Sequence, residues 1–175
     1  MIKRHLQHTI ENWLFRNKII ILYGARQVGK TTLAKVLLRA YGNERAYFNC
    51  EIPSFQELLR SKEPTQLQRV FGKEKVVVLD EAQFIPEIGQ ILKIIADHLP
   101  EVQIIATGSS SFELANRTSE ALTGRALTFT LYPFSYAELS THYGPIDARA
   151  QLETWLRLGT YPEIALANEQ DGRIL

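Results

Sequence analysis

This sequence has little cysteine and no long hydrophobic run. One cysteine, Cys50, stands among 175 residues, so the chain cannot form an internal disulfide or a thiolate cage around a metal ion. This favours a reducing, cytoplasmic compartment and disfavours a structural zinc site. The longest apolar stretches, around residues 19–23 and 76–79, fall far short of the roughly 20 residues that a transmembrane helix needs. Residues 1–11 are polar and amphipathic, which argues against a signal peptide and export. We expect no membrane partner.

The charge of the chain is balanced overall but uneven along its length. The 20 Lys+Arg and 19 Asp+Glu residues give a formal net charge of +1, which excludes a histone-like polycation and an acidic solvating tail. Residues 1–50 hold 9 basic and 2 acidic side chains, whereas residues 51–175 hold 11 and 17. The basic N-terminal part should therefore meet an anion.

Size and periodicity predict one α/β domain with a parallel sheet covered by helices on both faces. The length of 175 residues and the hydrophobic content of 45% suit a single core. Short β-branched runs alternate with longer amphipathic stretches, as in parallel sheets. The predicted strands cover residues 18–22, 45–49, 75–79, 102–106 and 126–131. The predicted helices between them cover residues 30–41, 54–71, 85–98 and 111–122.

The two ends of the chain add helices to this pattern. Ile2, Leu6, Ile10 and Leu14 repeat every four residues and predict an N-terminal helix. Residues 133–142 and 148–158 predict two helices with no strand between them. We therefore expect residues 1–132 to form the core and residues 133–175 to form part of a helical appendage.

The segment between the first strand and the next helix carries a phosphate-binding motif. The run Gly24-Ala25-Arg26-Gln27-Val28-Gly29-Lys30-Thr31 matches G-x-x-x-x-G-K-[ST], in the strand-to-helix context that the motif needs. Glycines let successive N–H groups converge on phosphate oxygens, and the helix adds its positive end. We expect Lys30 to bridge the outer phosphates and Thr31 to bind Mg²⁺. The expected nucleotide-binding residues are Gly24, Ala25, Arg26, Gln27, Val28, Gly29, Lys30, Thr31 and Thr32.

Two carboxylates follow the third predicted strand. Asp80 and Glu81 come directly after an apolar run, and parallel strands carry ligand sites at their C-terminal edges. We expect Asp80 to hold Mg²⁺, through its waters, and Glu81 to orient and deprotonate the water that attacks the γ-phosphate. A helix cap is the structural alternative for this pair. Gln83 either senses the nucleotide state or is a polar residue at a helix start.

Polar residues also follow the fourth strand and precede the fifth. Thr107 and Ser109 are candidates for contacting the γ-phosphate or the attacking water, whereas Ser110 or Ser111 could equally cap the next helix. Arg125 stands at the turn into the fifth strand and is a candidate finger for the nucleotide of a neighbouring subunit. Arg117 is the fallback for that role. A solvated arginine on a turn is the alternative for both.

These motifs together resemble the AAA+ superfamily of P-loop ATPases. The segments LYGARQVGKTTL, VVLDEAQ, ATGSSS, LTGRALTFTLYPFSYAEL and GTYPE are similar to the prokaryotic archaeal-type ATPases, predicted ATP-binding proteins whose complete forms carry a C-terminal nuclease-like domain. The resemblance implies a three-layer αβα fold with sheet order 5-1-4-3-2 and the start of a helical lid. It strengthens the case for Arg125 and for a homo-oligomer. It also implies that this chain is a fragment, because relatives continue beyond the segment at residues 159–162.

The expected activity is Mg²⁺-dependent ATP hydrolysis that drives rearrangement of a partner or an attached domain. An ATP-gated switch in DNA- or defence-linked processes, with little turnover, is the alternative. A small-molecule or nucleotide kinase would share the loop at Gly24, but this sequence shows no acceptor-binding segment. A protein or DNA partner would act through the missing C-terminal region. Lys3, Arg4 and His5 are candidates for contacting the base only by their position, and the sequence leaves ATP and GTP undistinguished.

Overall fold

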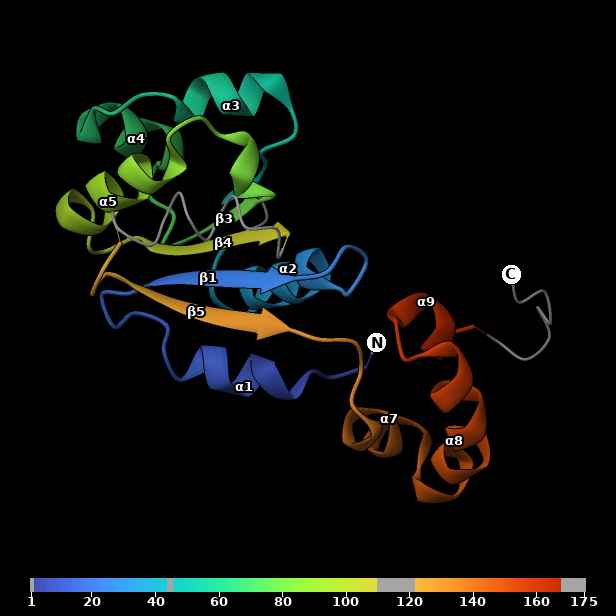
Figure 1. Cartoon of the computed structure of the whole chain (residues 1–175). Helices are drawn as coiled ribbons and strands as arrows, with labels where there is room; N and C mark the ends of the chain where they lie inside the picture. Colours follow the sequence, from blue (N-terminus) through green and yellow to red (C-terminus); the bar gives the residue numbers. More distant parts are fainter. Residues whose placement is uncertain (1, 44–45, 110–121, 168–175) are drawn as a thin grey trace.

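A five-stranded parallel sheet forms the centre of the computed structural model, which describes residues 2–43, 46–109 and 122–167. The strand order is β2-β3-β4-β1-β5, and all four neighbouring pairs are parallel (Figure 1). This confirms the order that the resemblance implied, with β4 between the strand that enters the phosphate-binding loop and the strand that carries the acidic pair. The strands are β1 (Ile19–Gly24), β2 (Tyr47–Asn49), β3 (Val76–Asp80), β4 (Gln103–Ser109) and β5 (Ala126–Leu131).

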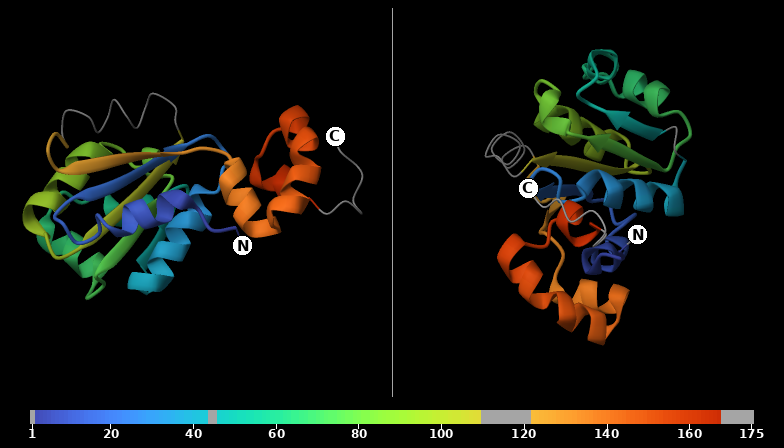
Figure 2. Two further views of the ribbon diagram at one scale, coloured as in Figure 1. Left: turned by 90° about the horizontal axis from the view of Figure 1, so that it is seen from below. Right: turned by 90° about the vertical axis from the view of Figure 1, so that its right-hand side faces the viewer.

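The central strands are buried on both faces, which explains their continuous apolar sequences. Every residue of β1 and of β3 is buried, as expected where helices cover both sides of a parallel sheet. Figure 2 shows α1 (His5–Glu11) and α2 (Lys30–Tyr41) on one side of the sheet and α5 (Ile88–His98) on the other. The prediction of α2 is confirmed at both of its ends.

Prolines divide two segments that periodicity alone predicted as continuous helices. The single helix expected over residues 54–71 is wrong, because α3 (Pro53–Leu59) ends before α4 (Pro64–Phe71) begins. Glu63 is extended, with φ −89° and ψ 118°, since the residue before a proline avoids the helical region. The start expected at residue 85 is also wrong. A 3-10 helix, η2 (Ala82–Phe84), comes first, and α5 follows Pro86 and a left-handed Glu87. The helix predicted over residues 111–122 lies almost wholly outside the described residues.

Within residues 132–167, three helices follow β5 and lie beyond the carboxyl ends of the strands (Figure 1). They are α7 (Tyr136–Tyr143), α8 (Pro145–Leu158) and α9 (Pro162–Ala165). Ser135 and Glu138 form a capping box at the start of α7, which explains why this helix begins after residue 133. A separate apolar cluster forms here from Ile2, Phe134, Leu139, Ala148, Trp155 and Ala165. We propose a domain boundary near residues 132–133 on this basis. Across the three described ranges, no helix combines the length and apolarity that crossing a membrane requires.

Arg4 connects these C-terminal helices to the core. Its Nε lies 3.3 Å from Oε1 of Glu138, and its guanidinium lies 4.3 Å from the centroid of the Phe134 ring. The same side chain donates hydrogen bonds to the carbonyl oxygens of Val28, at 3.3 Å, and of Tyr132. Arg4 is 8% exposed. Of the three residues that are candidates for contacting a nucleotide base by their position, Arg4 is therefore disfavoured, because these buried partners occupy its guanidinium.

The carboxylate of Glu138 makes the stability of this junction depend on pH. Burial alone would raise the pKa of Glu138, but hydrogen bonds from the backbone of Ser135 and His5 and the charge of Arg4 lower it below 4.5. The stabilisation from a carboxyl group with a lowered pKa is complete above its unfolded-state value and is lost as the pH falls through its folded-state value.

We predict that Glu138→Gln lowers stability by about 3 kcal/mol near neutral pH, because it leaves the buried Arg4 charge without its partner. In thermal melts, the difference from wild type should shrink as the pH falls below 4.5, the usual value for this group. Glu57→Gln is the matched control, since Glu57 pairs with Arg60 in an exposed position. An equal response of the two variants to pH would contradict this account of the junction.

Candidate nucleotide-binding site

The loop between β1 and α2 is held tightly against the end of β5. A Cβ atom built on Gly24 would lie 2.5 Å from the carbonyl oxygen of Leu131 and 2.9 Å from Cγ1 of Val28. Gly29 has φ 101° and ends the loop immediately before the first residue of α2, and Gln27 also has a positive φ of 61°. Glycine is thus required at position 24 by contact and favoured at position 29 by conformation. The first N–H groups of α2 lack partners within the helix, so they face the loop as an anion site.

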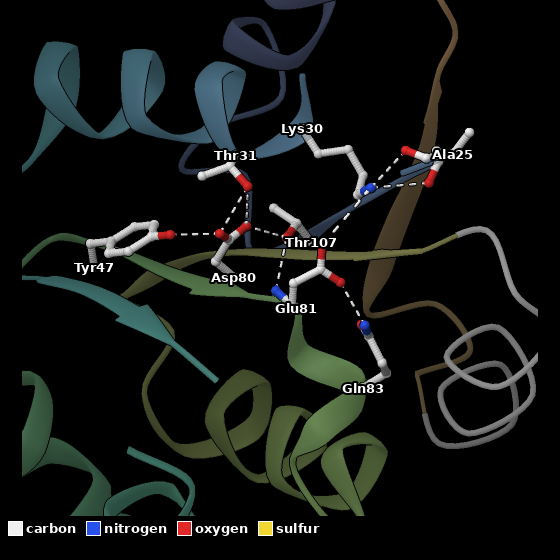
Figure 3. A network of polar contacts seen from close by, with 9 residues as sticks. Ala25, Lys30, Thr31, Tyr47, Asp80, Glu81, Gln83 and Thr107 are labelled. Carbon is white, nitrogen blue, oxygen red and sulfur yellow. Dashed lines mark hydrogen bonds and ion pairs between the residues drawn. The ribbon is translucent and has the colours of Figure 1, made fainter. Parts of the chain in front are cut away.

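Lys30 places its ammonium group at the centre of this loop. Its Nζ donates hydrogen bonds to the carbonyl oxygens of Gly24, at 3.1 Å, and Ala25, at 2.9 Å, and lies 4.0 Å from Oε1 of Glu81 (Figure 3). Lys30 is 4% exposed. Burial lowers the pKa of Lys30, and the carboxylates of Glu81 and Asp80 oppose that change. The structure therefore brings the predicted phosphate-binding lysine beside the predicted acidic pair.

Three hydroxyl groups converge on the carboxylate of Asp80 at the end of β3. The Oγ1 of Thr31 lies 2.9 Å from Oδ2 and 3.1 Å from Oδ1. The phenol of Tyr47 donates to Oδ2 at 2.5 Å, and Thr107 donates to Oδ1 at 2.5 Å. Figure 3 shows these contacts arriving from different sides of the carboxylate. Thr31 and Asp80, the two predicted metal ligands, are thus neighbours.

The oxygen groups of Thr31 and Asp80 fit a magnesium ion. Mg²⁺ prefers hard oxygen ligands and keeps several waters, so it needs few protein groups. The direct contact between this hydroxyl and this carboxylate brings the two expected ligands within reach of one ion. The donor set therefore agrees with the cation that the sequence predicts.

Glu81 has a strained backbone and a side chain held by a neighbour. Its φ of 54° and ψ of 48° lie in the left-handed region, which is costly for a residue other than glycine and is often found at functional sites. The N–H of Glu81 donates to Oγ1 of Thr107 at 3.0 Å. Its Oε2 accepts a hydrogen bond from Nε2 of Gln83 at 2.5 Å. Gln83 thus contacts the predicted base directly. The left-handed backbone of Glu81 and the 3-10 helix after it, which make this contact possible, are not predicted by the spacing of apolar residues.

The two candidates on β4 occupy different positions. Thr107 is fully buried, and its hydroxyl is engaged by Asp80 and by the backbone of Glu81. Ser109 pairs with Gly24 in the register of β4 and β1, which places it beside the start of the loop. This geometry favours Ser109 as the group near the outer phosphate and gives Thr107 a supporting position. Ser110, Ser111 and Arg117 lie outside the described residues.

The remaining loop residues differ in their exposure. Arg26, Gln27 and Thr32 are exposed, whereas Val28 is fully buried. The C-terminal helices approach the same loop, because a Cβ atom on Gly29 would lie 3.9 Å from Cγ of Pro162 at the start of α9.

Arg125 lies near the amino ends of the strands, whereas the loop lies at their carboxyl ends. It precedes Ala126, which pairs with Ile19 at the start of β1, whereas the loop follows the end of β1. Its Nε lies 2.6 Å from Oδ1 of Asp97, and this hydrogen bond lowers the pKa of Asp97. The structure does not bring Arg125 to the loop of its own chain, so any contact with a nucleotide would involve another subunit.

Tyr47 is the site residue that the sequence analysis missed. It pairs with Val78 in the register of β2 and β3, so Asp80, two residues further along β3, lies on the same face of the sheet. The parallel order alone places β2 beside β3, but the register needed to bring Tyr47 to Asp80 is not visible in the sequence.

The fold and the site together define a nucleotide-binding α/β domain, and comparison with known proteins supplies the family. The sequence profile of the family described as "AAA domain" matches residues 16–140. This range contains the loop and the acidic pair. The chain belongs to the AAA domain family.

Several proteins and structures are similar to this chain. The uncharacterised protein MJ1637 of Methanocaldococcus jannaschii is 31% identical over 148 residues, which cover 79% of this chain and 30% of that protein. The uncharacterised protein Rv2008c of Mycobacterium tuberculosis is 26% identical over 170 residues, which cover 97% and 36%. The chain therefore spans about a third of the length of these relatives. The Pif1 helicase of Candida albicans is 16% identical, with a TM-score of 0.47, over 87% of this chain and 44% of that one; these values support no argument about function.

We predict that Gly24→Ala destabilises the protein by about 3 kcal/mol, because the new methyl group overlaps a backbone carbonyl and forces the loop or β5 to move. Urea unfolding measures this loss. Gly72→Ala is the control, since nothing lies within 4 Å of the added Cβ. Only the backbone strain of an alanine at φ 64° and ψ −125° then lowers stability, by on the order of 1 kcal/mol. A Gly24→Ala loss no larger than that of the control would contradict the close approach.

Proposed function

We propose that this chain is an Mg²⁺-dependent ATPase module whose hydrolysis cycle drives rearrangement of a partner or of an attached domain. The observation that carries the proposal is the convergence of Lys30, Thr31, Asp80 and Glu81 at one edge of the sheet, within the contacts described above. Membership of the AAA domain family supports nucleotide binding and hydrolysis as the general activity. The more specific assignment to archaeal-type ATPases remains a prediction.

In this proposal, the loop grips the triphosphate through its backbone and through Lys30. The ammonium group that now contacts the carbonyl oxygens of Gly24 and Ala25 would exchange them for phosphate oxygens. Thr31 and Asp80 would hold Mg²⁺, which when bound neutralises charge on the outer phosphates. Ser109 would contact the γ-phosphate from the neighbouring strand.

Glu81 would supply the base for hydrolysis. A carboxylate within reach of a water can orient that water and accept its proton as it attacks the γ-phosphate. Lys30, 4.0 Å from Glu81, would stabilise the negative charge of the base before the proton moves. Because Gln83 holds Oε2 of Glu81, the other carboxylate oxygen, Oε1, would accept the proton.

The same hydrogen bond supports a second candidate, an ATP-gated switch with little turnover. In such a protein, Gln83 would keep Glu81 from its water for most of the nucleotide-bound lifetime. Binding itself would then carry the signal to a protein or DNA partner. The two candidates differ in the rate of phosphate release and share the nucleotide site.

Oligomer formation and partners are further parts of the proposal. Arg125, near the amino ends of the strands, would act on a neighbouring subunit's nucleotide after leaving Asp97. A protein or DNA partner would bind outside residues 1–175, in a region like the one that the longer relatives carry beyond the matched part. Lys3 and His5, both exposed, remain candidates for contacting the base.

We predict that Lys30→Ala raises the dissociation constant for ATP at least about tenfold, because it removes the charge that faces the outer phosphates. Glu81→Gln should keep ATP affinity while lowering phosphate release by on the order of 10²- to 10⁴-fold. Titration with a fluorescent ATP analogue measures the first effect, and steady-state phosphate release, with ATP and GTP side by side, measures the second. An unchanged ATP affinity in Lys30→Ala would contradict the role assigned to the loop. A wild-type protein that releases no phosphate would favour the ATP-gated switch.

We predict that Arg125→Ala lowers phosphate release per subunit on the order of 10³-fold at protein concentrations where subunits associate, with ATP affinity unchanged. Asp97→Ala is the matched control, because it breaks the same ion pair and leaves the arginine in place. Phosphate release measured against protein concentration tests both variants. If the two variants lose activity equally, Arg125 serves the fold rather than a neighbouring site.

A further inference from the structure

The phenol of Tyr47 approaches the expected metal-binding carboxylate from β2, which β3 and β4 separate from β1 in the sheet. Its hydroxyl donates to Oδ2 of Asp80 at 2.5 Å. A phenol is protonated at neutral pH, so Tyr47 is the donor in this hydrogen bond. The ring of Tyr47 has a contact of its own that does not involve the hydroxyl group, because Nζ of Lys35 lies 4.4 Å from the ring centroid.

The three hydroxyl groups that donate to Asp80 differ in whether they are expected to bind the metal ion. Thr31 is expected to bind the metal ion with its hydroxyl oxygen, so its contact with Asp80 must adapt when the ion arrives. Tyr47 and Thr107 are not expected to bind the ion, and they hold opposite oxygens of the carboxylate, Oδ2 and Oδ1. These two donors can therefore keep the carboxylate oriented throughout the nucleotide cycle.

Tyr47 is better suited than Thr107 to reveal this effect. Thr107 also accepts a hydrogen bond from the backbone of Glu81 at 3.0 Å, so removing its hydroxyl disturbs the predicted base as well. Within the part of the chain that the structure describes, the Tyr47 hydroxyl donates its hydrogen bond to Asp80. Tyr47→Phe keeps the ring and its contact with Lys35, and it removes one donor to one carboxylate oxygen.

We propose that Tyr47 is a positioning residue for magnesium, which fixes the carboxylate of Asp80 for contact with the ion or its waters. The inference rests on the proposed function, because it concerns the metal site of that same reaction. Outer-shell hydrogen bonds to a metal-ligating group orient that group, and their removal typically lowers metal affinity by about 10- to 100-fold. The phenol of Tyr47 occupies this outer position.

The test is the magnesium dependence of nucleotide binding by the whole chain. A fluorescent, non-hydrolysable ATP analogue is titrated at increasing Mg²⁺ concentrations and again in excess EDTA. For Tyr47→Phe we expect the Mg²⁺ concentration at half-maximal effect to rise about tenfold. The affinity measured in EDTA should match that of wild type, because the loop and Lys30 are untouched. A purely structural role for Tyr47 would lower both affinities together.

Tyr143→Phe is the matched control. The Tyr143 hydroxyl donates to the carbonyl oxygen of Ala165, also at 2.5 Å, in the C-terminal apolar cluster. This variant removes a phenolic hydrogen bond of the same length away from Asp80, and its magnesium dependence should equal that of wild type. A rise as large as that of Tyr47→Phe would overturn the inference.

A second comparison uses Asp80→Asn as the background. If Tyr47 acts through the Asp80 carboxylate, adding Tyr47→Phe to Asp80→Asn should change the Mg²⁺ requirement little further. An equal additional rise in that background, or an unchanged or lower requirement in Tyr47→Phe alone, would overturn the inference.

The outcomes also separate this inference from the proposed function. If wild-type nucleotide affinity does not depend on Mg²⁺, both fail. If wild type shows the dependence and Lys30→Ala loses binding while Tyr47→Phe behaves as wild type, the inference about Tyr47 alone fails.

Discussion

Parallel pairing of β1, β3 and β4 is the constraint on which the candidate site depends. Because the three strands run in the same direction, the loop after β1, the acidic pair at the end of β3 and the polar end of β4 meet at one edge of the sheet. Helices on both faces bury these strands, which fixes the strand ends relative to one another. The hydrogen bonds of Thr31 and Thr107 to Asp80, and the approach of Lys30 to Glu81, become possible only through this arrangement.

The loop is joined to the C-terminal helices as well as to the sheet. Arg4 contacts the carbonyl oxygen of Val28 in the loop and the carboxylate of Glu138 in α7, and Pro162 of α9 approaches Gly29. A change in the loop on nucleotide binding would therefore meet two contacts that lead directly into these helices. Such contacts provide a physical route by which a change in the loop would reach the C-terminal helices.

The parts of the site that follow from the sequence are those encoded by short, contiguous segments. The loop motif lies within residues 24–31, and the position of Asp80 and Glu81 after an apolar strand places them at the same sheet edge. The contact of Tyr47 with Asp80 depends on strand register, and the contact of Arg4 with Glu138 depends on packing between residues far apart in the chain. Periodicity encodes neither of them. The division between α3 and α4 is a different case, since Pro64 is visible in the sequence but apolar spacing suggested one helix.

The central claim is that residues 24–31 bind a triphosphate with the help of Lys30, and a crystal structure of the chain with a non-hydrolysable ATP analogue and magnesium tests it most directly. The account predicts phosphate oxygens within the loop and the Lys30 amine moved onto them from the carbonyl oxygens of Gly24 and Ala25. A loop without nucleotide, with the amine still on those carbonyl oxygens at a saturating analogue concentration, would contradict it.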